Sequence, residues 1–342
     1  MRQVWIPRAG PPDVLEVRDA ADPEPKPGQL RIRVEAAGVN FADIMGRLGI
    51  YPDLPKMPVV VGYEVAGKID AAGDGVDQGW IGKNVFAMTR FGGYSDVVCV
   101  PELQVYERPP GMSADDGAAL PVNYITAYQL VVVMGGLRSN ETMLVHSAGG
   151  GVGIAATQLA KKIGATVIGT ASKSKHEFLA ESGVDHLIDY RTEDFEPRVR
   201  DLTGGRGVEL ILDAVGGESW RKGFRVLAPT GRLGMFGMSS AASGKTRRLS
   251  DVLRTIVKTP WLSFMPPTLL NENKAVFGVN VGHLWDEMDR VRAWMDALLA
   301  DYRSGAIKPV IAERFALERA ADAHHYIQDR RNIGKVLLIC SS

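Results

Sequence analysis

A short glycine-rich stretch carries the clearest chemical pattern in the chain. Ala148, Gly150 and Gly153 have the spacing of the G-x-G-x-x-G fingerprint, with alanine in the first position, between an apolar segment at 143–146 and an amphipathic one at 154–163. Small residues at these places let backbone N–H groups approach a pyrophosphate at the positive end of a helix. The pattern therefore predicts a strand, a tight turn and a helix that bind a dinucleotide, and a glycine-rich turn without a ligand is the alternative. The predicted binding residues are Ala148, Gly149, Gly150, Gly151, Val152 and Gly153.

The residues after the next predicted strand, 166–169, indicate which dinucleotide binds. A site for NAD usually has Asp or Glu about twenty residues past the glycines, where it holds the ribose 2′-hydroxyl. The stretch 170–175 reads TASKSK, which offers hydroxyls and cations and no carboxylate. These groups suit a 2′-phosphate, so we expect NADPH, with Ser172 and Lys175 at the phosphate. The alternative is that the lysines are solvated residues at a helix start, where cations are slightly unfavourable.

Composition narrows the class of protein. The length of 342 residues suggests two domains, and 40 basic residues balance 40 acidic ones, so nothing points to nucleic acid. Two cysteines, Cys99 and Cys340, provide no disulfide framework. The N-terminus lacks an apolar signal core, and there is no run of eighteen apolar residues. We therefore expect a cytoplasmic protein.

The sequence pattern changes near residue 122, from short strand-like runs to strands that alternate with helices. Residues 1–122 contain short alternating or apolar runs broken by Pro and Gly, which predicts a small, partly open β-barrel. Residues 123–281 alternate strands with helices. Residues 282–342 add a long amphipathic helix at 283–304 and a final strand at 335–340 that returns to the first domain. The expected fold class is therefore α/β, a doubly wound parallel sheet inserted in a barrel domain. Its later strands are expected at 184–188, 208–213, 232–236 and 275–281.

Several separate motifs resemble one known superfamily. GVNFAD (38–43), GYEVAG (62–67) and AGGGVG (148–153) look like a medium-chain dehydrogenase/reductase. The closest likeness is to its zinc-independent quinone oxidoreductase branch, and within it to the synaptic vesicle membrane protein homologues, which the runs at 120–131, 169–179 and 332–338 resemble. The resemblance implies a GroES-like barrel domain, an NADPH-binding Rossmann domain and a homodimer.

The resemblance also sets an expectation about metals. Zinc-dependent members have a zinc-binding cysteine where Asn40 stands, a histidine where Tyr63 stands and a four-cysteine lobe, of which only Cys99 is present. A catalytic zinc needs about three protein ligands. We therefore expect no metal, and hydride transfer to an electrophilic acceptor, a quinone or a related enone.

The same resemblance assigns the remaining site residues. It places Asn40 and Tyr51 beside the nicotinamide and the acceptor, and in related enoyl-thioester reductases the tyrosine at this position donates a proton. Tyr51 as a loop aromatic packed over the cleft is the alternative. Thr126 is expected to contact the nicotinamide carboxamide, and Tyr190 to flank the 2′-phosphate. The residues expected to line the nicotinamide side are Gly237, Phe277, Val279 and Asn332.

Other polar residues are expected to be structural. Asp43 and Glu64 are predicted to satisfy backbone groups in the barrel, rather than to act as acids in the reaction. His324 and His325 have no matching set of metal ligands and are predicted to lie on a surface helix.

One segment fits the reductase less directly. Within 245–264, basic residues interleave with apolar ones and are followed by Trp261 and Phe264. Such a segment suits peripheral contact with an anionic membrane, a lid over the substrate or a dimer contact. The alternative functions are therefore an NADPH-binding, membrane-associated or redox-sensing protein with little turnover, and an enoyl-thioester reductase.

Overall fold

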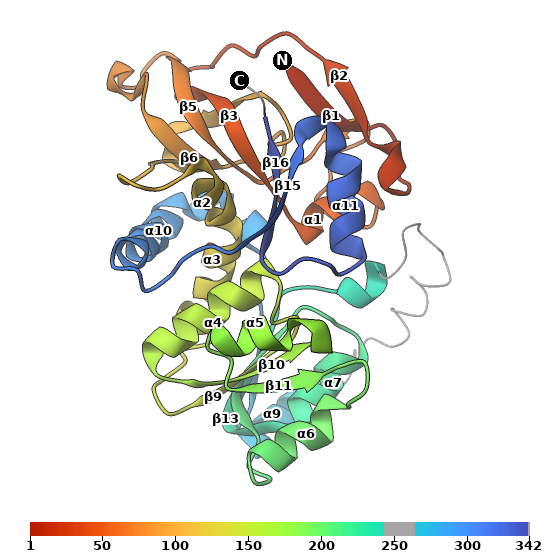
Figure 1. The fold of residues 1–342 in the computed structure, drawn as a ribbon. Coiled ribbons are helices and arrows are strands. Elements are labelled where there is room, and N and C mark those ends of the chain that lie inside the picture. The colour runs from red at the N-terminus through yellow and green to blue at the C-terminus, as the bar shows by residue number, and fades with distance from the viewer. Residues whose placement is uncertain (243–263, 341–342) are drawn as a thin grey trace. The chain divides into compact units, whose positions relative to one another are not determined.

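The computed structural model describes residues 1–242 and 264–340, and Figure 1 shows their course. The described residues form two compact units. Unit 1 contains residues 1–123 and 282–340, and unit 2 contains 124–242 and 264–281. The chain thus leaves the first unit, builds the second and returns.

A barrel-like sheet of seven strands forms the body of unit 1. Its order is β15-β16-β3-β5-β6-β8, with β7 paired to β3, so β16 lies between β15 and β3 (Figure 1). The antiparallel register pairs Val336 with Val39, so the final strand returns to the first domain as predicted. The strands are β3 (Gln29–Val39), β5 (Glu64–Ala72), β6 (Asn84–Met88), β7 (Val97–Pro101), β8 (Val105–Glu107), β15 (Ile311–Ala316) and β16 (Lys335–Ile339).

Smaller elements complete unit 1. Alternation explains its core, because Leu30, Ile32 and Val34 of β3 are all buried while Arg33 is exposed. A second sheet has the order β2-β1-β4. Its strands are β1 (Arg2–Ile6), β2 (Glu16–Asp19) and β4 (Val59–Val60), and the helices of the unit are α1 (Phe41–Arg47), α2 (Ala114–Ala119), α10 (Met288–Arg303) and α11 (Ala320–Gln328).

Unit 2 is built on six parallel strands in the order β11-β10-β9-β12-β13-β14. The chain builds outwards from β9 to β11 and then returns to the other side at β12, which confirms the predicted doubly wound sheet. All six residues of β12 are buried, as expected where helices cover both faces. The strands are β9 (Thr142–Val145), β10 (Thr166–Ala171), β11 (His186–Asp189), β12 (Val208–Asp213), β13 (Leu227–Met235) and β14 (Ala275–Gly278).

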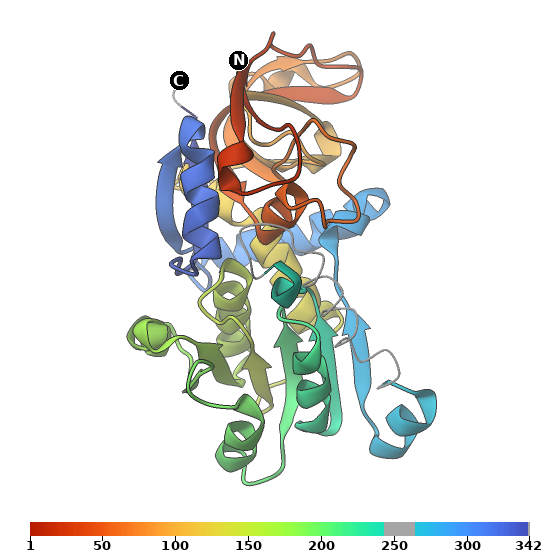
Figure 2. The ribbon, with the colours of Figure 1, turned by 90° about the vertical axis from the view of Figure 1, so that its right-hand side faces the viewer.

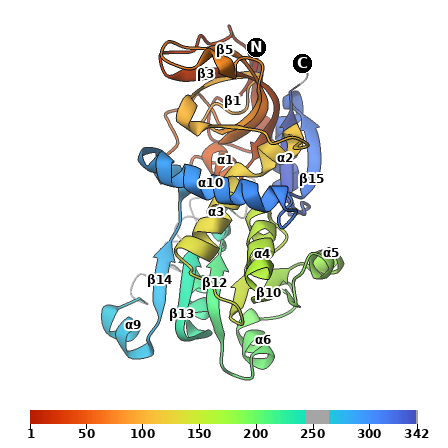
Figure 3. The same cartoon turned by 90° about the vertical axis from the view of Figure 1, so that its left-hand side faces the viewer.

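Helices connect these strands. The helix α3 (Pro121–Tyr128) leads from unit 1 into unit 2. Figure 2 shows strands β12 to β14 side by side, and Figure 3 shows α9 beside the outer strand β14. The other helices are α4 (Gly151–Ile163), α5 (His176–Glu181), α6 (Phe195–Leu202), α7 (Glu218–Arg225) and α9 (Pro266–Glu272).

Candidate functional site

The glycine-rich turn forms the tight connection from β9 to α4. Gly150 is the N-cap of α4, and its N–H donates to the Ser147 carbonyl at 2.8 Å. A side-chain carbon at Gly153 would lie 2.6 Å from the carbonyl oxygens of both Ala148 and Ser147. Only glycine therefore fits where the first turn of the helix passes under the loop. This strand, turn and helix are the structure that the sequence predicted.

The residues predicted to hold a 2′-phosphate lie at the carboxyl ends of neighbouring strands. Ser172 follows β10 and Tyr190 follows β11, and β10 itself pairs with β9. Lys175 lies over the turn, since a side-chain carbon at Gly149 would be 3.0 Å from Lys175 Cδ. Ser172 is buried and its hydroxyl contacts that of Ser174 at 3.3 Å, whereas Tyr190 is 40% exposed. The fold thus brings these predicted residues to the carboxyl ends of the neighbouring strands β10 and β11.

The residues predicted for the nicotinamide side fall at the ends of other strands. Gly237 lies two residues beyond β13, and the N–H of Val279, just beyond β14, donates to the Met235 carbonyl at 2.9 Å. Phe277 lies in β14, and its ring lies over Gly234, where a side-chain carbon would be 2.7 Å from Phe277 Cζ. In unit 2 these residues therefore share the carboxyl edge of the sheet with the turn. Thr126 is half-buried in α3, and Asn332 precedes β16 in unit 1 and donates to the Gly334 carbonyl at 3.1 Å.

Asn40, the predicted catalytic residue at the start of α1, is held at both its backbone and its side chain. Its N–H donates to Oδ2 of Asp43, the third residue of α1, at 2.8 Å. Its side-chain amide lies between two charged groups, because Oδ1 accepts from Lys335 Nζ at 2.7 Å and Nδ2 donates to Glu64 Oε1 at 2.9 Å. Lys335 also donates to Glu64, and Glu64 Oε2 accepts the N–H of Val122 at 2.8 Å. Asp43 and Glu64 thus accept backbone N–H groups, as predicted.

Lys335 was not among the site residues predicted from the sequence. It is the first residue of β16 and is 3% exposed, although lysine is rarely buried without a charged partner. The available signal was a cation that opens an apolar run, KVLLI, at a strand expected to return to the barrel.

A second set of buried polar side chains is linked to Asp43 by hydrogen bonds. Tyr94 donates to Asp43 Oδ2 at 3.1 Å, His324 Nε2 lies 3.2 Å from the Tyr94 hydroxyl, and Arg47 Nη1 lies 3.2 Å from His324 Nδ1. Because Arg47 can only donate, His324 accepts at Nδ1 and donates from Nε2, so the donors all run towards Asp43. The prediction of a surface position for His324 was wrong, because its ring is fully buried against Tyr94; His325 is half-buried and lies 3.2 Å from Asp13.

Burial shifts the titration of these groups. Loss of water raises the pKa of Asp43 to about 7, against the opposite effect of its backbone donors and of the Lys335 charge. Burial and the nearby Arg47 lower the pKa of His324 well below its ordinary value, so its ring is neutral. Burial lowers the pKa of Arg47 to about 10. Near neutral pH, Asp43 is therefore the group of this set whose charge responds to pH.

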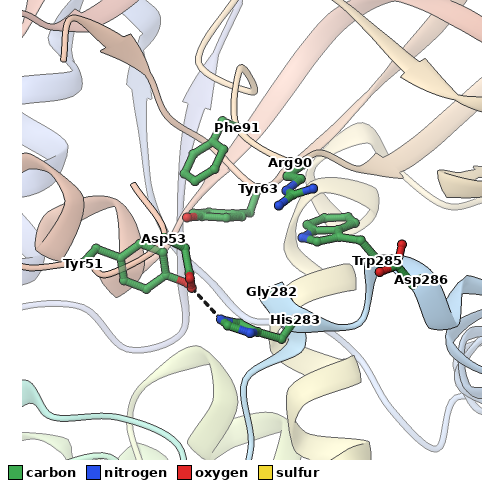
Figure 4. A pocket seen from close by; sticks show the side chains of 9 residues that line it. All are labelled: Tyr51, Asp53, Tyr63, Arg90, Phe91, Gly282, His283, Trp285 and Asp286. Carbon is green, nitrogen blue, oxygen red and sulfur yellow. Dashed lines mark hydrogen bonds and ion pairs between the residues drawn. The ribbon is translucent and has the colours of Figure 1, made fainter. Parts of the chain in front are cut away.

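A cavity of about 190 Å³ lies in unit 1 beside Tyr51 (Figure 4). Asp53 Oδ2 and His283 Nε2 lie 2.8 Å apart at its wall, and Arg90 projects from the other side. Four aromatic side chains line it, which gives a surface suited to a flat ring system. They are Tyr51, Tyr63, Phe91 and Trp285.

Tyr63 packs among these rings. Its centroid lies 6.2 Å from that of Tyr51, edge to face, and 5.2 Å from that of Phe91. Burial is the largest cause that raises the pKa of Tyr63 well above its ordinary value, followed by the charge of Asp43. Tyr63 therefore stays a neutral phenol.

Zinc does not fit the residues at this place. The positions that the resemblance assigns to zinc ligands hold the Asn40 amide and the neutral Tyr63 phenol, and the neighbouring Glu64 carboxylate is paired with the Lys335 ammonium. Zinc prefers thiolate, imidazole or free carboxylate ligands, and a fixed cation opposes a second one. Among the described residues, no three His, Cys, Asp or Glu side chains are grouped so as to hold a metal ion.

The basic and apolar segment 245–264, for which membrane contact, a lid and a dimer contact were the alternatives, falls mostly outside the described residues, which exclude 243–263. Phe264 is described, and its ring packs against Phe224 at 5.5 Å, beside the core of unit 2. Phe264 is therefore a partly buried side chain that packs on that core. Among residues 1–242 and 264–340, no helix has the length and apolar character that a membrane span requires.

Comparison with known proteins agrees with this architecture. Residues 26–110 match the model of the alcohol dehydrogenase GroES-like domain, and residues 151–297 match that of the zinc-binding dehydrogenase. The synaptic vesicle membrane protein VAT-1 homolog of Mus musculus is 42% identical over 95% of this chain and 80% of its own length. The chain belongs to the medium-chain dehydrogenase/reductase superfamily. The predicted combination of a GroES-like domain with a Rossmann sheet is thereby confirmed.

Two bacterial members of the superfamily are similar over the whole chain. The quinone oxidoreductase of Pseudomonas aeruginosa is 34% identical over 96% of this chain and 97% of its own. The crystal structure of Escherichia coli quinone oxidoreductase complexed with NADPH superposes with a TM-score of 0.87 at 26% identity, covering 99% of this chain and 100% of that one. The likeness therefore places the chain near the quinone oxidoreductase branch that its motifs indicated.

Proposed function

We propose that this protein is an NADPH-dependent, zinc-independent oxidoreductase that transfers hydride to quinones or related enones. The observation that carries the proposal is the strand-end cluster of unit 2, where Lys175 lies over Gly149 and Ser172 follows β10 with no carboxylate beside it in the sequence. The pyrophosphate would rest on the N-terminus of α4, and the 2′-phosphate near Ser172, Lys175 and Tyr190. Two similar quinone oxidoreductases, one of them solved with NADPH, support the same reading.

In this proposal the residues of unit 1 bind the acceptor and stabilise the charge that forms on it. NADPH, when bound, supplies the hydride. The aromatic cavity beside Tyr51 would hold a planar acceptor and exclude water from it. Hydride addition leaves negative charge on an acceptor oxygen, and Tyr51 and the Asn40 amide would donate hydrogen bonds to it. No step uses a metal, because the residues at the zinc positions do not fit one.

An acceptor panel tests this proposal together with the role of Tyr51. Consumption of NADPH is followed by absorbance with 9,10-phenanthrenequinone, an aliphatic enone and an enoyl thioester, in wild type and in Tyr51→Phe. We expect rapid consumption with the quinone, and for Tyr51→Phe a fall in kcat/KM of about tenfold, the low end for loss of a positioned hydrogen-bond or proton donor. Full activity in Tyr51→Phe would show that the Tyr51 hydroxyl has no chemical role and that the residue only lines the cavity.

A separate experiment tests whether the activity is independent of zinc. The protein is dialysed against a chelator, its metal content is measured and the quinone assay is repeated. We expect unchanged activity at less than stoichiometric zinc. Loss of activity that returns on adding zinc contradicts this part of the proposal.

A further inference from the structure

Lys335 is a deeply buried cation beside the candidate site, and it serves two neighbours at once. Its Nζ donates to Asn40 Oδ1 at 2.7 Å and to Glu64 Oε1. The side chain of Lys335 is 3% exposed and that of Glu64 is fully buried. Such a pair is costly to bury, so its presence calls for an explanation beyond ordinary stability.

The two charges determine which way the Asn40 amide faces. The carbonyl oxygen meets the ammonium, and Nδ2 meets the carboxylate at 2.9 Å. Rotation of the amide by a half-turn would place its NH₂ against the ammonium and its oxygen against the carboxylate, so both contacts would become repulsive. In the observed orientation, Nδ2 uses one hydrogen for Glu64 and keeps a second hydrogen to donate.

The backbone of Asn40 is fixed independently. Its N–H is held by Asp43, whose other oxygen accepts the N–H of Gly62 at 3.0 Å. The amide group is therefore the part of this residue whose direction depends on Lys335 and Glu64. The strand register explains how a residue near the C-terminus reaches it, since Val336 pairs with Val39.

We propose that Lys335 is a positioning residue, which with Glu64 orients the Asn40 amide so that its remaining N–H faces the reacting groups. The proposal rests on the proposed function, in which Asn40 binds the cofactor or acceptor. The competing explanation is that Lys335 only neutralises Glu64 and stabilises the barrel.

A double-mutant cycle separates the two explanations. The change Lys335→Met/Glu64→Gln removes both charges together and avoids an unpaired buried charge. In wild type the carboxylate only accepts, from Asn40 Nδ2 and from the Val122 N–H. The introduced side-chain amide can instead accept from Val122 with its oxygen and donate with its nitrogen to the Asn40 oxygen. That bond favours the reversed amide. The change is made in wild type and in Asn40→Ala, and each protein is measured for kcat/KM with 9,10-phenanthrenequinone, for the Kd of NADPH and for its thermal midpoint.

If Lys335 acts through Asn40, the paired change lowers kcat/KM by about tenfold in wild type, but by less than about twofold in Asn40→Ala, because coupled residues are not additive. The thermal midpoint stays near that of wild type. Recovery of full activity in the neutral variant overturns the proposal, as do an equal loss in the Asn40→Ala background and full activity in Asn40→Ala itself.

A substitute variant and the behaviour of the wild type separate failure of the positioning role from failure of the proposed function. If the neutral variant does not fold, Lys335→Arg keeps a cation with donors, and the same cycle with Asn40→Ala applies to it. A wild type that binds NADPH but reduces no quinone refutes the proposed activity, and the cycle is then decided on the Kd of NADPH. A wild type that is active but shows additive effects refutes the positioning role alone, whereas one that neither binds NADPH nor reduces quinones refutes both.

Discussion

Asp43 connects the two buried polar groups of unit 1. It receives hydrogen bonds from the backbone of Asn40 and Gly62 and from the Tyr94 hydroxyl, yet it is buried enough that its pKa rises to about 7. A carboxyl whose pKa is higher in the folded than in the unfolded chain binds more protons when folded. Its contribution to stability is therefore fully present below about pH 4 and is lost as the pH rises to about 7.

Replacement of Asp43 tests this assignment. Between about pH 4 and 7, Asp43 is expected to lower the free energy of unfolding by up to about 1.4 kcal/mol per pH unit. Urea unfolding at several pH values should therefore show a weaker decline with rising pH in Asp43→Asn than in wild type. Tyr94→Phe keeps the carboxyl and should keep the decline; equal slopes in wild type and Asp43→Asn would refute the pKa assignment.

The residues that the sequence analysis placed wrongly or missed share one cause. The roles of Asp43 and Glu64 followed from residue type within a barrel motif. His324 and Lys335 have partners far away in sequence, since His324 is 277 positions from Arg47 and Lys335 is 271 positions from Glu64. Local patterns contain no information about such contacts, which depend on how the C-terminal elements, β16 among them, return to the barrel.

At the scale of elements, the strand, turn and helix around the glycines were predictable because each part has a local signal. The turn needs small residues, and α4 ends at Gly164 in the left-handed conformation, φ 90°, that glycine favours. The long helix was expected from residue 283 but begins at Met288, because 281–283 and 285–287 form short 3₁₀ turns. Strand β14 was expected to reach residue 281 but ends at Gly278, because its backbone pairing with β13 ends there although the apolar run continues.

Two alanine substitutions in the turn should have different effects. Gly153→Ala places a carbon 2.6 Å from two backbone oxygens and should lower the thermal midpoint by several degrees. Gly150→Ala has its nearest contact at 3.3 Å and an ordinary φ of −80°, so the fold should tolerate it. Because a methyl group there would meet the pyrophosphate, Gly150→Ala should instead weaken NADPH binding about tenfold. Thermal unfolding and a fluorescence titration measure the two effects; equal stability of the variants would contradict the packing argument.

At the scale of the whole molecule, β11 and β14 are the edges of the sheet in unit 2. An unpaired strand edge can pair with another chain, and the family resemblance favours a homodimer formed in this way. Light scattering after gel filtration should therefore give twice the 37.1 kDa mass of one chain. Ala275→Lys, which adds a charge at an exposed position of β14, should reduce the dimer fraction. A single-chain mass for wild type at micromolar concentration would contradict the expected homodimer.

The most direct test compares NADPH with NADH as hydride donor to 9,10-phenanthrenequinone in the wild-type protein. The hydroxyls and lysines after β10 predict a kcat/KM at least about tenfold higher for NADPH, with one hydroquinone formed per NADPH consumed. Equal use of both donors would refute the assigned 2′-phosphate site. Binding of NADPH without consumption by any quinone or enone would contradict the reductase function itself.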